Sequence, residues 1–269
     1  MPTRWLKLTV AYDGGAYAGW QVQPDKPTVQ GVVEAAWCEI TQESVRLTAA
    51  GRTDAGVHAL GQVAGVVTES QLSTADLQRG LNAMLPDDVA ILAVEEARQG
   101  FHATHDAIGK RYCYHIHNAR LRSVFNRHYA WHYPQPLDAA VMHVAGQGLV
   151  GRHDFSSFES AGSERPDAVR TITELAVARG RESFATGEHA TSLSTQSQKT
   201  PDPFLVTIEI AGDGFLYNMV RAIVGTLIEV GRGARGVDWP REVLAAQDRR
   251  RAGQTVPPHG LFLVSVDYD

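Results

Sequence analysis

The apolar residues in the first half of the chain follow two periods, which predict strands and helices. Near-alternation over residues 5–10 predicts a first strand, closed by the turn Asp13-Gly14-Gly15. One helix follows the start signal Pro27-Thr28, and another begins at Ser73, with Asp76 completing a capping box. Their apolar faces hold Val29, Val32, Val33, Ala36, Trp37 and Ile40, and Leu77, Leu81, Met84 and Leu85. Further strands are predicted at residues 45–48, 62–67 and 89–94.

The second half repeats this plan. Strands are predicted at residues 111–116, 171–178, 204–210 and 261–266, and an apolar helix at residues 215–230. An earlier helix has its apolar positions at Leu137, Val141, Val144, Ala145 and Leu149. Each half therefore follows a β-α-β-β-α-β order, which gives an antiparallel sheet with helices on one face.

These patterns predict an α+β protein of two halves, residues 1–106 and residues 107–269. The stretch near residues 180–203 is rich in Ser, Thr, Gln and Gly and poor in apolar residues. We interpret it as a mobile surface loop inserted in the second half.

Composition favours a protein of the cytoplasm. No apolar run approaches the roughly 20 residues that a membrane helix needs, and the first residues lack the apolar core of a signal peptide. The two cysteines, Cys38 and Cys113, have no metal-type spacing, which fits a reducing compartment.

The charge balance alone argues against a general nucleic-acid binder, because the formal net charge is −5 and the pI about 6.1. Local cationic surface matters more than net charge, however. Basic residues cluster at Lys110-Arg111, at Arg120, Arg122 and Arg127, and at Arg249-Arg250-Arg251. Such clusters are also found on ordinary solvated surfaces.

The segment GRTDAGVHA at residues 51–59 is the first candidate for chemistry. It brings the carboxylate of Asp54 next to Arg52 and His58, between glycines that permit a tight backbone. An aspartate held ionised in such a loop can act as a nucleophile. The alternative is a plain turn in which Asp54 bonds the local backbone.

Arg221 is the second candidate, because it is the one charged residue in the apolar run from Phe215 to Ile228. Burying a guanidinium there requires an anion from another element, and a neighbouring cation would keep Asp54 ionised. The alternative is that Arg221 reaches solvent or pairs with Asp213 or Glu229.

In Lys110-Arg111-Tyr112-Cys113-Tyr114 an aromatic ring stands beside two cations. This combination suits an exposed base stacked on an aromatic ring, with phosphates held alongside by the cations. Packing within the core is the alternative for both tyrosines. The histidines at 102, 105, 115 and 117 suggest a metal, but no carboxylate or cysteine completes the site, and we expect none.

Taken together, these segments resemble the TruA-type tRNA pseudouridine synthases. GRTDAGVHALGQVA resembles the signature of that family, and other stretches resemble it in the same order. These are YDGGAYAGWQVQPDKPTVQGVVEAA, FHATHDAIGKRYCYHI, GRHDFSSF, GFLYNMVRAIVGTLIEVG and PPHGLFLVSVDY. One departure is visible: Thr104 stands where the family usually has an arginine.

The resemblance implies two ferredoxin-like halves around one long, mixed, mainly antiparallel sheet with helices on one face. It implies that Asp54 is the catalytic nucleophile or base, that Arg221 is its cation, and that Tyr112 stacks on the target base. Arg52 would hold the everted nucleotide, and Lys110, Arg111 and His58 would help to bind the RNA.

For the whole protein, the resemblance implies a homodimer that modifies uridines at positions 38–40 of the tRNA anticodon stem-loop without metal or cofactor. Two other hypotheses remain: a non-catalytic RNA-binding protein and a metal-assisted hydrolase. The first predicts tRNA binding without any change in the RNA, and the second predicts sensitivity to chelators.

Overall fold

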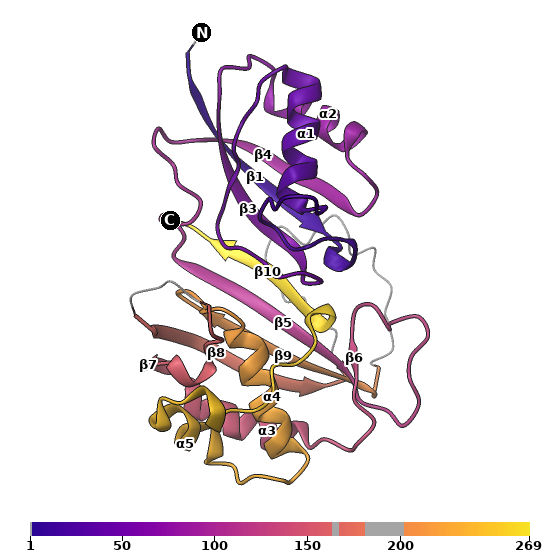
Figure 1. Ribbon diagram of the computed structural model, residues 1–269, viewed down its shortest axis with the longest axis vertical. Coiled ribbons are helices and arrows are strands. Elements are labelled where there is room, and N and C mark those ends of the chain that lie inside the picture. Colours follow the sequence, from indigo (N-terminus) through magenta and orange to yellow (C-terminus); the bar gives the residue numbers. More distant parts are fainter. Residues whose placement is uncertain (1, 163–166, 181–201) are drawn as a thin grey trace. The chain divides into compact units, whose positions relative to one another are not determined.

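The computed structural model describes residues 2–162, 167–180 and 202–269. It combines helices with strands that pair mainly antiparallel, which confirms the α+β class (Figure 1). It contains two compact units: unit 1 is Met1–Lys110 with Phe262–Asp269, and unit 2 is Arg111–Leu261. Residues 181–201, on which most of the predicted inserted loop falls, lie outside the described residues.

The division into units differs from the predicted halves in two respects. The boundary falls after Lys110 rather than after residue 106, and the last strand belongs to unit 1 rather than to the second half. The second difference arises because Phe262 and Leu263 pair in parallel with His58 and Ala59. Sequence periodicity identifies a strand but carries no information about a partner some two hundred residues away.

Unit 1 has the strand order β4-β1-β3, with β2 and β10 both on the outer edge of β3. β2 pairs with the end of β3 near Gly65, whereas β10 pairs with its beginning at His58. The order β4-β1-β3-β2 is the ferredoxin-like arrangement. The elements are β1 (Arg4–Tyr12), α1 (Val29–Thr41), β2 (Thr48–Ala49), β3 (His58–Thr68), α2 (Thr74–Met84), β4 (Val89–Ala97) and β10 (Leu261–Asp267).

The core of unit 1 lies between its sheet and its two helices, which cover one face (Figure 1). Leu6, Leu8 and Val10 of β1 are fully buried, as the alternation predicts. The predicted helix starts are confirmed: the Thr28 hydroxyl accepts from the Gly31 N–H, and that of Ser73 accepts from the Asp76 N–H.

Two details of unit 1 correct the prediction. Met84 was predicted on the buried face of this helix, but its side chain is 52% exposed. It is the last residue of α2, and the chain leaves the helix at this point. The strand predicted at residues 45–48 is reduced to Thr48–Ala49. The Leu47 N–H donates to Glu34 of α1, and the Leu47 carbonyl accepts from Gln30, so the backbone here bonds helix side chains instead of a strand.

A smaller apolar cluster covers the second face of the unit 1 sheet. Ala50, Val63 and Ala103 are buried in it, and Phe101 and Tyr268 pack against them. Tyr268 also donates from its hydroxyl to the Ala103 carbonyl over 2.7 Å. This cluster anchors the end of β2, where the loop that carries Asp54 begins.

Unit 2 has the strand order β5-β9-β8-β7, with β6 paired to β5. The helices of unit 2 lie on one side of this sheet (Figure 1). The elements are β5 (Gly109–His117), β6 (Trp131–His132), α3 (Ala139–Gly146), β7 (Gly151–Asp154), β8 (Val169–Arg179), β9 (Leu205–Gly212), α4 (Met219–Gly231) and α5 (Trp239–Ala246).

The helices of unit 2 also differ from the prediction. α3 ends at Gly146, and Met142 is buried on it, while Val141 and Val144 are exposed. Nearly every position of α3 is apolar, so periodicity does not define its buried face. α4 begins only at Met219, because its N-cap Asn218 adopts a left-handed φ of 61°.

Candidate active site

Asp54 lies in the loop between β2 and β3 and is partly buried, while the neighbouring Arg52 is exposed. The Val57 N–H donates to the Asp54 carbonyl over 3.1 Å, and Gly56 has a φ of 77°. The backbone therefore does form a turn, as the alternative interpretation of Asp54 required. The hydrogen bond that closes this turn uses the Asp54 main-chain carbonyl and does not involve the side-chain carboxylate.

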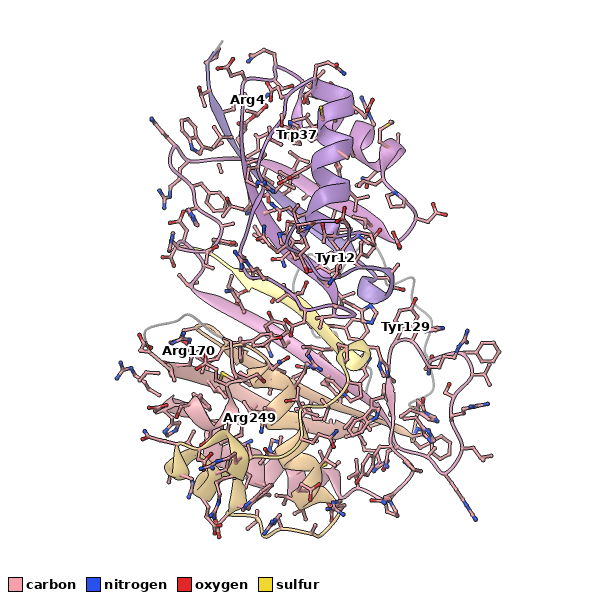
Figure 2. The ribbon with its side chains drawn as sticks, in the orientation of Figure 1. Arg4, Tyr12, Trp37, Tyr129, Arg170 and Arg249 are labelled. Atoms are coloured by element: carbon pink, nitrogen blue, oxygen red, sulfur yellow. The ribbon has the colours of Figure 1, made fainter. Side chains whose placement is uncertain are left out.

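A buried network of side chains supports the loop from the sheet. The hydroxyls of Tyr12 and Thr53 are 2.7 Å apart, and the Gln62 amide donates to the Tyr12 hydroxyl over 3.4 Å and to the Gly51 carbonyl over 2.8 Å. Tyr12, labelled in Figure 2, is 5% exposed, Thr53 6% and Gln62 0%. Burial raises the pKa of Tyr12 to about 12, so its hydroxyl keeps its proton at neutral pH.

Three side chains donate hydrogen bonds to the carbonyls of three consecutive residues that lead into the loop of Asp54. Thr104 Oγ1 donates to the Ala49 carbonyl over 2.6 Å, and Lys110 Nζ to the Ala50 carbonyl over 2.8 Å. The Gln62 amide donates to the third carbonyl, that of Gly51, as described above. Lys110, predicted to hold phosphates, thus also bonds the backbone of the candidate loop. Thr104 does the same from the position where the family usually has arginine.

The turn after β1 packs closely against the other side of the loop. A Cβ at Gly14 would lie 1.9 Å from the Val57 carbonyl oxygen, so only glycine fits there. At Gly19, with a φ of 93°, a Cβ would lie 2.5 Å from the Thr53 carbonyl oxygen. The same carbonyl accepts from the Trp20 N–H over 3.0 Å. These contacts fix the backbone on both sides of Asp54.

His58 lies behind this loop and is only 2% exposed. Its Nδ1 accepts from the Gly14 N–H over 3.1 Å and is 3.0 Å from Asp13 Oδ1. Its ring stacks on Phe262, with 4.8 Å between the centroids. His58 was predicted to bind substrate, but these contacts tie it to the turn after β1 and to β10.

In unit 2, Arg221 is half-buried in the first turn of α4. Its Nε donates to the Val256 carbonyl over 2.7 Å and its Nη1 to Asn218 Oδ1 over 2.6 Å. The two carboxylates suggested as alternative partners are engaged elsewhere: Glu229 pairs with Arg232, and Asp213 accepts from the Thr171 N–H.

The segment that supplies the Val256 carbonyl is itself anchored. Arg249, labelled in Figure 2, donates to the Gly253 carbonyl and to the Thr255 hydroxyl over 2.9 and 2.7 Å. Within the same basic cluster, Arg250 pairs with Asp248 at 2.8 Å. These two arginines therefore have structural partners within the chain.

Two further predicted residues lie on β5. Tyr112 is 8% exposed and meets Phe215 edge-on, with 5.2 Å between the ring centroids. Arg111 is 2.8 Å from Glu174 and 3.5 Å from Glu209, so two carboxylates of the sheet orient its guanidinium. Burial raises the pKa of Glu209, and the nearby Arg111 opposes this shift.

His102 and His105 lie in a turn that the His102 ring shapes. The N–H groups of Thr104 and His105 both donate to Nδ1 of His102. No group of three or more potential metal ligands occurs among the residues that the structure describes. Within the same residues, no helix is long and apolar enough to cross a membrane.

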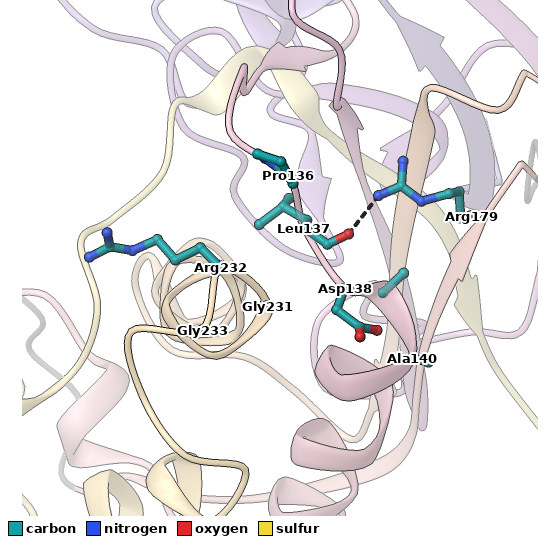
Figure 3. A pocket seen from close by; sticks show the side chains of 9 residues that line it. Pro136, Leu137, Asp138, Ala140, Arg179, Gly231, Arg232 and Gly233 are labelled. Atoms are coloured by element: carbon teal, nitrogen blue, oxygen red, sulfur yellow. Dashed lines mark hydrogen bonds between the residues drawn. The ribbon is translucent and has the colours of Figure 1, made fainter.

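A surface hollow of about 640 Å³ lies in unit 2 between the start of α3 and the end of α4 (Figure 3). Arg179 donates there to the Leu137 carbonyl over 2.8 Å, and Arg232 pairs with Glu229. Asp138 caps α3 by accepting from the Val141 N–H. None of the predicted site residues lines this hollow, and its charged groups stabilise helix ends.

Comparison with known proteins identifies the family. The profile of a family described as tRNA pseudouridine synthase matches residues 8–106 and 145–269. The chain belongs to this family. A tRNA pseudouridine synthase A from Acetivibrio thermocellus is 43% identical over 263 residues, with 98% of this chain and 99% of the relative covered. One from Brevibacillus brevis is 44% identical over 263 residues, with the same two shares covered.

Family membership confirms the predicted resemblance and the predicted enzyme class. The chain is an isomerase of the pseudouridine synthase type, which converts uridine to pseudouridine in tRNA. Asp54, Arg52, His58 and Lys110 all lie on or against one loop of unit 1. Arg221, Tyr112 and Arg111 lie on α4 and β5.

Replacing Tyr12 by phenylalanine tests the buried network. We expect Tyr12→Phe to lower kcat roughly ten- to hundredfold, because small displacements of a catalytic group have effects of that size. The KM for tRNA should barely change, since Tyr12 is buried. Stability should fall by about 1–3 kcal/mol, because the variant leaves a buried hydroxyl and amide with fewer partners. Steady-state kinetics and urea unfolding measure the two effects.

Tyr17→Phe is the matched control. The Tyr17 hydroxyl donates over 2.6 Å to Asp88 and not to a residue of the Asp54 loop, so this variant loses a hydrogen bond that does not hold the loop. It should lose stability and keep its kcat. Equal kcat values for the two variants would contradict the positioning role of Tyr12.

Proposed function

We propose that this enzyme isomerises uridines at positions 38–40 of the tRNA anticodon stem-loop, with Asp54 as nucleophile or base. The observation that carries the proposal is the position of Asp54. It lies within the family signature, on a loop whose Thr53 side chain is held by Tyr12 and whose backbone is held by Gln62 and Lys110. Preorganisation of this kind is what a catalytic carboxylate requires.

The target uridine must leave the stacked stem before its sugar and base can be reached. Tyr112 is proposed to take up the everted base, and stacking on an aromatic ring returns about 1–3 kcal/mol per base. The exposed Arg52 is proposed to hold the neighbouring RNA backbone. Lys110 and Arg111 are proposed to add positive charge beside it, and His58 to act through the loop rather than on the RNA.

Asp54 is proposed to react as the carboxylate, with Arg221 as the cation that favours the charged form. Asp54 attacks the sugar or the base, or removes a proton from the sugar. The bond between N1 and C1′ breaks, the uracil turns in the site, and a bond forms between C5 and C1′. C5 loses its proton and N1 gains one, so the step is redox-neutral and consumes no co-reactant.

The assembly that fits this proposal is a cytoplasmic homodimer acting on tRNA. The match to the Acetivibrio tRNA pseudouridine synthase A, which covers 98% of this chain and 99% of that relative, supports tRNA as the partner. Sedimentation equilibrium of the purified enzyme measures the oligomeric state. A monomer at micromolar concentration would contradict the dimer.

Tritium release from tRNA that carries 5-tritiated uridine tests the reaction. C5 loses its hydrogen only when it becomes the glycosidic carbon, so the enzyme should release tritium in proportion to the pseudouridine formed. Substrates labelled in the anticodon stem-loop alone should release as much as whole labelled tRNA. Binding of tRNA without release would favour the non-catalytic RNA-binding hypothesis.

A further inference from the structure

The connection between β5 and β6 projects from the edge of unit 2 and carries a local excess of positive charge (Figure 1). Arg120, Arg122 and Arg127 are all exposed there. No Asp or Glu occurs between Asn118 and Leu137, although the whole chain has a formal net charge of −5. The segment is therefore an isolated cationic surface on an acidic protein.

These three arginines differ from most exposed arginines of unit 1. Arg46, Arg79 and Arg98 each pair with a carboxylate, whereas the arginines at 120, 122 and 127 form no ion pair with any residue that the structure describes. Arg127 donates to the Val124 carbonyl, which orients the guanidinium without neutralising it. Their charge is available to an external anion.

Large apolar side chains are exposed between these arginines. Phe125 is 89% exposed and Leu121 80%, and Val124 and Tyr129 are also exposed (Tyr129 is labelled in Figure 2). A group of adjacent apolar side chains that are exposed to solvent marks an interaction surface. An aromatic ring beside guanidinium groups is the combination that binds unpaired bases and their phosphates.

The segment has a defined conformation. The ring Nε2 of His117 bonds the Leu121 carbonyl at 3.1 Å, and that of His132 bonds the Ala119 carbonyl at 2.9 Å. Within the segment, the Asn126 carbonyl accepts from the N–H groups of Tyr129 and Ala130 over 3.0 Å. A surface that is ordered before binding loses less conformational entropy when a partner docks.

We propose that residues 120–129 are a docking surface for tRNA, separate from the loop of Asp54. The arginines bind phosphates, and Phe125 packs on an unpaired or distorted part of the RNA. A second copy of this chain is a poorer fit. A symmetric contact through the segment would bring two identical cationic surfaces together. The inference rests on tRNA as the substrate, as in the proposed function.

The test compares two triple variants of the full-length enzyme by the salt dependence of tRNA binding between 50 and 200 mM KCl. Arg120→Gln/Arg122→Gln/Arg127→Gln should make the slope of log K against log[salt] shallower by about 2 to 3, since each phosphate contact contributes roughly 0.7–0.9. Arg46→Gln/Arg79→Gln/Arg98→Gln changes the net charge equally but removes paired arginines, and should keep the wild-type slope.

Phe125→Ser adds a second measurement. It should raise the Kd roughly five- to hundredfold without changing the slope, because it removes stacking and no charge. Equal slopes for the two triple variants would overturn the proposal. So would a Phe125→Ser enzyme that binds tRNA normally but changes its mass in sedimentation equilibrium, which would make the segment an interface between copies. If the proposed function itself were wrong, the result would be different: the wild-type enzyme would release no tritium.

Discussion

Asp54→Asn should abolish tritium release, with a loss of at least roughly 10⁴-fold in kcat, as removal of a catalytic nucleophile usually gives. Asparagine preserves the size of the side chain and removes only its charge. The turn around it uses the Asp54 carbonyl and the Thr53 hydroxyl, neither of which the substitution touches. The fold and the Kd for tRNA should therefore stay close to wild type.

Asp25→Asn is the matched control for this variant. Asp25 is an exposed turn residue of unit 1 with a φ of 57°, a conformation that asparagine also adopts readily. It should release tritium at the wild-type rate. If Asp54→Asn lost tRNA binding together with turnover, Asp54 would belong to docking or folding rather than to the chemistry.

Gly225→Ala should have the largest effect on stability. Alanine favours a helix over glycine by about 1 kcal/mol, so α4 alone would be stabilised. A Cβ at Gly225 would, however, lie 1.8 Å from the Gln254 carbonyl oxygen, and both groups belong to fixed backbone. Displacing the Gln254 segment costs about 3 kcal/mol or more, as overpacking does. The net result should be a loss of about 2 kcal/mol or more, measured by urea unfolding.

The same substitution should also lower kcat, because Gln254 is two residues from the carbonyl that orients Arg221. Gly80→Ala in α2 is the control, since its Cβ would meet the flexible end of Ile40 at an ordinary 3.4 Å. This helix should become more stable by up to about 1 kcal/mol, with unchanged activity. If Gly80→Ala also lowered the free energy of unfolding, the steric contact with the Gln254 carbonyl would not explain the effect of Gly225→Ala.

Sequence reasoning located those elements whose signals are local. The start of α1 at Thr28 and of α2 at Ser73 depends on side chains that cap the backbone within three residues, and both were predicted correctly. α5 and β7 were missed. Their sequences, WPREVLAA and GRHD, are too short to show a clear period.

The candidate site shows the same limit. Asp54 stands out because its loop combines charge with glycine, whereas Tyr12, Thr53 and Gln62 are interpreted from sequence as strand or loop residues. Their function as a network depends on a contact between residues 41 positions apart, which no local pattern contains. The ion pairs of Arg111 show the same limit, since Glu174 and Glu209 reach it from strands distant in the sequence.

The place of β10 in unit 1 has a consequence for synthesis of the chain on the ribosome. Unit 1 contains Met1–Lys110 but also needs Phe262–Asp269, which are made only after Arg111–Leu261 of unit 2. The ring of Phe262, on which His58 stacks, is thus absent while most of the polypeptide is being translated. The loop of Asp54 acquires its final support only after unit 2 has been translated, so a nascent enzyme stays immature until all of unit 2 has emerged.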